Sequence, residues 1–486
     1  MSYSGLKDLS EFVISRIPTR DVNYADVRVC HRTHEHIVVR NGIPQRVWTS
    51  ESCGVGIRVR VADWWGFSGT SNLTSIGVES AIRNAIATAG SVGYIPGAGE
   101  PFVPPPPTTA EYATPMVRDP FSVPLSEKLT LLETACAQMG KDPRLNLREA
   151  SLEIWKDIIV FCSTTGSRIS QTIVHCGAGI VAWASDKGII QCRSYPASFG
   201  GNYRAAGYEF IEALDLPGNA PRVAAEAIEL LTAPPCPART TTVILESSQL
   251  ALQIHESVGH PLELDRIFGF EASFAGTSFV TPDMLGRFVY ASPLVNIMAD
   301  ATVPGGLGTF SHDDEGVAAQ CEPLITEGVL TGVLSSCSTA PKVGRASSGA
   351  MRADGWQHFP LVRMTNINLQ PGQSELDELI AETKDGIWLE TNRSWSIDDR
   401  RMRFQFGTEI GREIHNGKLG RLVRNPIYRG ITPLFWKSCD GICNSSQWKL
   451  WGVPNCGKGE PMQVARVGHG CAPARFRNVE VGSASG

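Results

Sequence analysis

The stretch TTVILESSQLALQIHESVGHPLELDR, residues 241–266, decides the fold of the C-terminal half of the chain. Its first six residues predict a strand, and the residues that follow predict a helix that carries His255, Glu256 and His260. Three residues separate Glu256 from His260, one more than in the helical zinc motif His-Glu-x-x-His. The spacing therefore raises the question of whether both histidines can hold one metal ion.

The late second histidine sets a geometric requirement. Two histidines five positions apart point about 140° apart on a regular helix, which is too wide for one ion. A shared metal therefore needs an underwound turn, and a π-bulge would provide it. Gly259 lies where the helix can bend, and Pro261 cannot donate the backbone hydrogen bond of a regular helix. We expect a distorted helix that brings both histidines to one metal site.

Upstream of this stretch, the sequence alternates between strand and helix patterns. Residues 25–70 alternate apolar and polar side chains around an Asn41-Gly42 hairpin signal. Helical patterns follow over 77–92, 126–141 and 220–233, a second strand-rich region covers 150–195, and the proline-rich segment 94–112 predicts a long loop. Clustered prolines at 234–237 predict a domain boundary. We expect an N-terminal α/β domain over 1–236 with a mixed or antiparallel sheet.

Downstream, hairpin patterns dominate. Turn signals at Glu327-Gly328 and Asn416-Gly417 each join two apolar runs. Residues 237–486 therefore predict a mainly antiparallel, barrel-like β domain that is preceded by the metal-binding helix. The fold class expected for the whole chain is α+β.

Composition narrows the class of protein. The chain has 486 residues, of which 42% are hydrophobic and 19% charged, and its formal net charge is −5. Because no basic block and no long apolar run is present, neither a nucleic acid nor a membrane is an expected partner. The thirteen scattered cysteines indicate a reducing, cytoplasmic location. No phosphate-binding loop and no Gly-x-Ser-x-Gly motif is present.

A catalytic zinc usually takes three protein ligands and leaves one position open for water. His255 and His260 supply two ligands, and Glu256 is placed to act as the general base. The sequence offers several candidates for the third ligand: Glu263, Asp265, His312, His358, Cys439, Cys456, His469 and Cys471. Among these, Cys456 is favoured because its glycine- and proline-rich turn leaves a thiolate accessible.

Several ordered motifs resemble one family. HESVGHPLELDR resembles the His-Glu-x-x-x-His segment of the TldD/PmbA family, long described as modulators of DNA gyrase and now regarded as zinc metallopeptidases. The other matching motifs are GVGIRV (54–59), GGLGTFSHDDEGVAAQ (305–320), HFPLVRMTN (358–366), IHNGKLGRLVRNP (414–426) and PNCGKGEPM (454–462). His312, directly before Asp-Asp-Glu, departs from the family pattern.

The resemblance implies a set of site residues. It places the cysteine ligand of a Zn²⁺ site at Cys456, beside His255 and His260. Glu263 and Asp265 are then natural carboxylates for orienting a ligand histidine. His312, His358 and Arg363 are candidates for contacting the substrate or an oxyanion.

The function implied is a zinc-dependent peptidase of the TldD type. Glu256 would activate a zinc-bound water against short or unfolded peptides bound as an extended strand. The resemblance also implies a dimer, either with a second copy or with a TldE (PmbA) subunit that lacks the zinc motif. Two alternatives stay open: a zinc amide hydrolase that tailors a small biosynthetic intermediate, and a non-catalytic regulatory binding protein.

Overall fold

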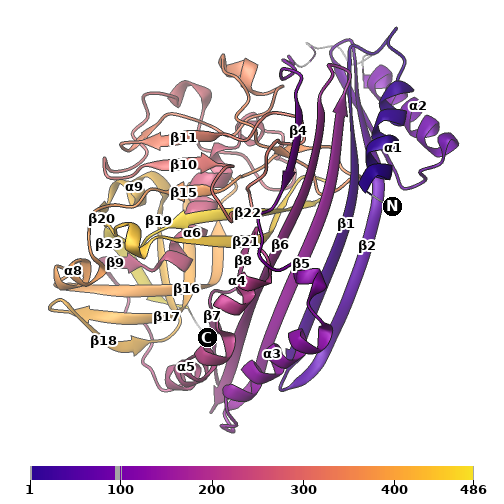
Figure 1. Cartoon of the computed structure of the whole chain (residues 1–486). Coiled ribbons are helices and arrows are strands. Elements are labelled where there is room, and N and C mark those ends of the chain that lie inside the picture. The colour runs from indigo at the N-terminus through magenta and orange to yellow at the C-terminus, as the bar shows by residue number, and fades with distance from the viewer. Residues whose placement is uncertain (1–2, 93–98, 100, 485–486) are drawn as a thin grey trace.

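The computed structural model describes residues 3–92, 99 and 101–484. A sheet of long strands forms one flank of the molecule (Figure 1). A second unit, which has shorter strands and contains a barrel, packs against this sheet. The α+β class predicted from the sequence is confirmed. The predicted division at 236/237 falls between the last helix of the first unit and the first strand of the second.

The N-terminal unit is built on an eight-stranded sheet. Its strands run in the order β3 (Trp64–Thr70), β2 (Ile43–Val61), β1 (Tyr24–Arg40), β5 (Leu145–Ser163), β6 (Arg168–Asp186) and β4 (Thr109–Ala113), with β7 (Ile189–Tyr195) and β8 (Asn202–Arg204) also paired to β6. Only β4 runs parallel to its neighbour, so the sheet is mixed, as predicted. The predicted loop over 94–112 is wrong at its end, where residues 109–112 belong to β4; residues 94–98 and 100 lie outside the described part.

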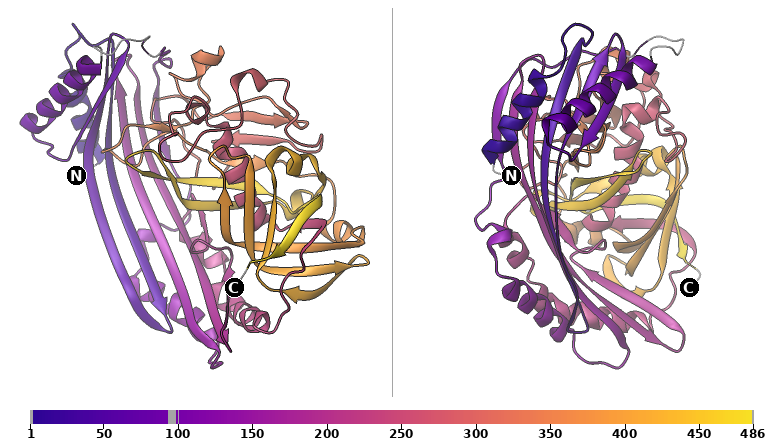
Figure 2. Two further views of the ribbon diagram at one scale, coloured as in Figure 1. Left: turned by 180° about the vertical axis from the view of Figure 1, so that it is seen from behind. Right: turned by 90° about the vertical axis from the view of Figure 1, so that its right-hand side faces the viewer.

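Helices cover one face of this sheet. α1 (Tyr3–Ser15) and α2 (Ser75–Val92) lie at one end, and α3 (Leu125–Gln138), α4 (Tyr208–Ala213) and α5 (Leu216–Leu230) at the other (Figures 1 and 2). Because side chains alternate along a strand, Val27 and Val29 of β1 pack under α1 and α2 while Arg28 and Arg32 point to the opposite face. That inner face receives the C-terminal unit.

The C-terminal unit contains a closed barrel. β16 (Asp385–Ile397), β9 (Arg239–Leu245), β23 (Ala474–Ser483), β19 (Pro426–Ile431) and β17 (Arg403–His415) pair in this order, and β17 pairs back to β16. β18 (Lys418–Val423) and β20 (Cys439–Ile442) extend it. The pairing of β9 with β16 is parallel and the others are antiparallel, so the predicted barrel-like, mainly antiparallel architecture is confirmed.

Smaller elements surround the barrel. One sheet joins β10 (Ile297–Asp300), β11 (Cys321–Thr326), β12 (Val329–Leu330) and β15 (Ile367–Leu369), and two separate pairs are β13 (Met351–Arg352) with β14 (Leu361–Val362) and β21 (Lys449–Lys458) with β22 (Gln463–Cys471). The helices are α6 (Ser247–Ile254), α7 (Leu264–Ile267), α8 (Leu376–Ala381) and α9 (Thr432–Lys437). Within the described residues, no helix has the length and apolar character to cross a lipid bilayer.

Candidate metal centre

The two motif histidines lie on a π-helical turn. α6 continues directly into a π-helix over His255–Gly259, and the backbone N–H of His260 donates to the carbonyl of His255, five residues earlier. A short 3₁₀ turn over His260–Leu262 follows. The widened turn brings the two imidazole ring centroids to 4.8 Å from each other. The distortion predicted from the spacing is confirmed.

A buried polar network supports the back of the π-turn. The Ser257 hydroxyl donates to the carbonyl of Gln253 at 2.5 Å and accepts from the indole N–H of Trp436 at 2.9 Å. The Tyr290 hydroxyl donates to the Ser257 carbonyl, and the Tyr428 hydroxyl donates to Gln253 at 2.9 Å. These groups satisfy polar atoms that a π-turn would otherwise leave unpaired in the core.

Gly259 is required for packing rather than for an unusual backbone angle. Its φ of −57° is ordinary for a helix. A Cβ at this position would collide with the thioether of Met364, which lies in the buried core. The sequence argument that Gly259 lets the helix bend is therefore corrected: the missing side chain makes room for Met364.

Cys456 completes the cluster from a different element. It lies on β21, and its Sγ is 3.6 Å from Nε2 of His260. One ligand atom each from His255, His260 and Cys456 lie within 4.8 Å of one another, and all three side chains are buried. The Arg363 guanidinium donates to the carbonyl of Cys456 and to that of Gln463, so it fixes the backbone that presents the thiol.

The outward ring nitrogens of both histidines are already engaged. Nδ1 of His255 lies 2.8 Å from Nε2 of His469, and Nδ1 of His260 lies 3.0 Å from a Glu263 oxygen. Each ring therefore keeps Nε2 for the cluster. Glu263 in turn contacts the buried Arg266 at 3.2 Å and the buried Lys458 at 3.3 Å.

The chemistry of this donor set fits zinc. Burial lowers the pKa of His255 to about 4 and also lowers that of His260, so both rings are neutral ligands near neutral pH. Burial alone would raise the pKa of the Cys456 thiol, but the nearby His260 and Arg363 outweigh it, and the pKa lies below its usual value. In a tetrahedral zinc site the ligand atoms are roughly 3.3–3.8 Å apart, a range that includes the 3.6 Å between His260 and Cys456.

Glu256 lies next to the cluster without belonging to it. Its carboxylate forms a 2.5 Å ion pair with the Arg401 guanidinium, which also donates to the carbonyl of Ala275 at 3.1 Å. Only 7% of the Glu256 side chain and 12% of the Arg401 side chain are exposed. The carboxylate is thus held in one orientation beside the histidines.

Within the described residues, the remaining predicted site residues do not belong to the cluster of His255, His260 and Cys456. Asp265 forms a 2.8 Å ion pair with Lys458. His312 lies in a neighbouring cavity, where its Nδ1 is 2.7 Å from the Ser311 hydroxyl, and the carbonyl of His358 accepts from Arg28. Cys439 and Cys471, two further candidates for the third ligand, are core thiols. The substrate-contact roles of His312, His358 and Arg363 stay predictions.

Two residues of the centre were missed or left undecided by the sequence. His469 was one of eight candidates for the third ligand, yet its ring contacts the outward nitrogen of His255 and is not a member of the cluster. Arg401 carried no signal at all, because it lies in a surface turn remote from the motif, between two strands of the barrel. Only the fold brings it to Glu256.

Comparisons with known proteins show the family to which the chain belongs. Models of three PmbA/TldA metallopeptidase domains match the chain: domain 1 over residues 25–90, the central domain over 118–233 and the C-terminal domain over 238–483. A protein of Methanothermobacter thermautotrophicus described as a metalloprotease is 31% identical, with 95% of this chain and 96% of that protein covered. A protein of Haemophilus influenzae described as a metalloprotease TldD homolog is 27% identical, with 95% and 93% covered.

A solved structure supports the fold. TldE from Thermococcus kodakarensis superimposes with a TM-score of 0.73 at 14% identity, covering 99% of this chain and 100% of that one. Together with the matched domains, these relatives show that the chain belongs to the PmbA/TldA metallopeptidase family, the TldD/PmbA family that its motifs resemble.

Proposed function

We propose that the chain is a zinc-dependent peptidase of the TldD type, acting on short or unfolded peptides. The observation that carries the proposal is the buried cluster of His255, His260 and Cys456 beside a fixed carboxylate. Family membership supports a metallopeptidase, and the donor set of two neutral imidazoles and one thiolate supports zinc over a hard cation.

The roles of the residues follow from their placement. His255, His260 and Cys456 would hold the ion, which when bound supplies a Lewis acid that acidifies water and polarises a carbonyl. Glu256 takes a proton from the attacking water and delivers it to the leaving amine. Arg401 holds the carboxylate in place during these transfers, while His469 and Glu263 keep the ligand rings oriented.

Metal content and peptide cleavage test the proposal together. Wild type and Glu256→Gln should each carry about one zinc per chain by mass spectrometry, and Cys456→Ala should lose it. Glu256→Gln should cleave peptides at least about 100-fold more slowly than wild type. Zinc-loaded wild type that cleaves no peptide or small amide would instead favour the non-catalytic binding protein.

The partner and the location belong to the same proposal. TldE from Thermococcus kodakarensis shares this fold, which supports assembly with a second copy or with a TldE/PmbA-type subunit. Light scattering of the chain alone and of its mixture with such a subunit would distinguish the two assemblies. All thirteen cysteines are free thiols, which supports a reducing, cytoplasmic location.

A further inference from the structure

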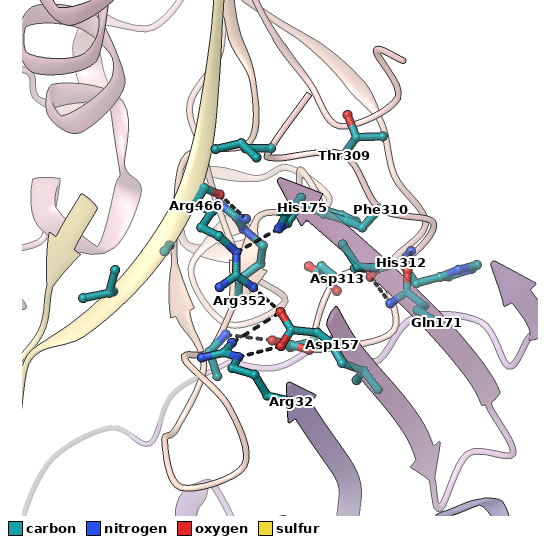
Figure 3. A pocket seen from close by; sticks show the side chains of 17 residues that line it. Arg32, Asp157, Gln171, His175, Thr309, Phe310, His312, Asp313, Arg352 and Arg466 are labelled. Carbon is teal, nitrogen blue, oxygen red and sulfur yellow. Dashed lines mark hydrogen bonds and ion pairs between the residues drawn. The ribbon is translucent and has the colours of Figure 1, made fainter. Parts of the chain in front are cut away.

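A cavity with both charged and apolar side chains in its lining lies between the inner face of the N-terminal sheet and β22 (Figure 3). The sheet contributes Asp157 and His175, and the C-terminal unit contributes Arg352 and Arg466. Ala465, also in the lining, is the strand partner of Cys456, so the cavity begins one strand away from the thiol. Its volume of about 70 Å³ holds a few water molecules or one small polar group.

Arg352 is a half-buried cation that forms no ion pair with a carboxylate in the described part of the chain. Its guanidinium donates to the carbonyls of Arg466, at 2.7 Å, and Met364. In the described residues it forms no ion pair with a carboxylate, and neither does the neighbouring Arg363. A guanidinium held away from water without a direct anionic partner is unfavourable, and among the described residues the buried Arg363 and the half-buried Arg352 both lack one.

The acids nearby are already engaged. Asp157 pairs with Arg32 at 2.5 Å and also with Arg466. Asp314 accepts from the backbone N–H of residue 353 at 2.7 Å and lies 3.4 Å from Arg28. Asp313 accepts from the backbone N–H groups of residues 315, 317 and 351. None of these carboxylates is within ion-pair distance of Arg352.

Two polar atoms of the cavity lining lack a hydrogen-bond partner, and both are donors. Nδ1 of His175 accepts from Nε of Arg466 at 2.8 Å, which places the ring proton on Nε2. That Nε2 and Nε of Arg352 are buried without a partner in the structure. His175 itself is only 4% exposed. The lining therefore presents two unmatched donors to one small space, one of them on a guanidinium that no carboxylate of the described residues contacts directly.

We propose that this cavity binds a carboxylate of the substrate, recognised by Arg352 and by the Nε2–H of His175. The inference rests on the proposed peptidase function, since it names the substrate class of that site. A carboxylate supplies acceptor oxygens for a guanidinium fork and an imidazole N–H at once. Its source is either the C-terminal carboxylate of a peptide or an Asp or Glu side chain.

Peptide binding to the zinc-loaded Glu256→Gln chain tests the inference without turnover. Fluorescence anisotropy would compare two kinds of peptide pair. The first pair is one alanine-rich peptide as the free acid and as the C-terminal amide. The second kind is a pair of C-terminal amides that differ only in Glu or Gln at one position, and that position is moved along the peptide. We expect the carboxylate member of one pair to bind about ten-fold more tightly. The first pair reports a terminal carboxylate and the second reports a side chain.

Variants then assign the preference to the cavity. Arg352→Gln should abolish the ten-fold difference and His175→Leu should reduce it, whereas Arg429→Gln, an exposed arginine outside the cavity, should leave it intact. If Arg352→Gln does not fold, two measurements still test the proposal. These are the carboxylate preference of the chain with the unaltered cavity and that of the His175→Leu variant.

The outcomes separate the two proposals. Equal binding within every pair would overturn the carboxylate site, whether or not the wild type cleaves these peptides. If the carboxylate peptides bind preferentially but zinc-loaded wild type cleaves none of them, the carboxylate site stands and the proposed peptidase function is wrong.

Discussion

At the scale of single residues, the centre depends on orientation as much as on ligand identity. Glu256 is fixed by Arg401, and the ligand rings are fixed by His469 and Glu263. Arg401 adopts a φ of 61°, in the left-handed region, and its carbonyl accepts from the Thr432 hydroxyl at 2.8 Å. The backbone of the turn that carries Arg401 is therefore anchored independently of the ion pair between its side chain and Glu256.

Replacing Arg401 should affect the chemical step rather than binding. We expect Arg401→Gln to lower kcat about ten-fold, with KM and zinc content unchanged, because Glu256 loses its fixed orientation. Arg401→Lys should recover part of the loss. Steady-state kinetics would be compared with Arg400→Gln, a change at the exposed neighbouring residue. A change confined to KM would contradict a role for Arg401 in positioning the base.

At the scale of secondary-structure elements, the sequence predicted local backbone geometry better than the pairing of strands that are far apart in the chain. The five-residue histidine spacing predicted the π-turn, and Asn41-Gly42, Glu327-Gly328 and Asn416-Gly417 all lie in the predicted turns with positive φ. The parallel pairing of β9 with β16 could not be predicted, because the two strands are far apart in sequence. For the same reason no pattern linked Arg401 to Glu256.

The π-turn depends on the contact of Gly259 with Met364, and a double substitution should show it. Gly259→Ala should lower the free energy of unfolding by about 1–3 kcal/mol, because its Cβ collides with the Met364 side chain. Combining it with Met364→Ala should cost less than the sum of the two single substitutions, because the truncated side chain leaves room for the new Cβ. Gly90→Ala, on the exposed side of α2 with open space around it, should be neutral or slightly stabilising.

Denaturant unfolding would measure the free energy of unfolding of the wild type, the two single variants, the double variant and Gly90→Ala. Additive effects of Gly259→Ala and Met364→Ala would show that the two side chains do not compete for the same space. Zinc content measured in parallel would show whether the turn still forms the metal centre.

At the scale of the whole molecule, buried ion pairs join the two units. Arg58 of β2 pairs with Asp26 of β1 at 2.6 Å and with Glu315, on the Asp-Asp-Glu loop of the C-terminal unit, at 2.8 Å. All three side chains are at most 2% exposed. The loop that resembles a family signature thus has a structural role at the junction.

Removing the shared cation should destabilise the junction. Arg58→Met should lower the free energy of unfolding by about 3–5 kcal/mol, because it leaves two buried carboxylates unpaired. Arg429→Met, which breaks an exposed pair with Glu480, should cost about 1 kcal/mol or less. Equal losses in the two variants, measured by urea unfolding, would argue against a structural role for the buried triad.

His175 should make this junction sensitive to acid. Burial, reinforced by Arg466, lowers the pKa of His175 well below 6.5, so the folded protein keeps the ring neutral. The unfolded chain binds this proton as the pH falls through about 6.5, so the contribution to stability is present above that pH and declines below it. Thermal midpoints between pH 8 and pH 5 should fall less steeply for His175→Gln than for wild type. Parallel curves would exclude His175 as a source of the acid sensitivity.

The extra residue in the π-turn also means that this motif cannot easily be converted into the commoner His-Glu-x-x-His motif. Deleting the buried Val258 would restore the ordinary spacing of a zinc helix. The same deletion would rotate everything after it by about 100° and shift it by about 1.5 Å along the axis. His260 would then leave a thiol that is fixed on a separate strand, β21. A single deletion cannot interconvert the two motifs, because the strand that carries Cys456 would have to move with the helix.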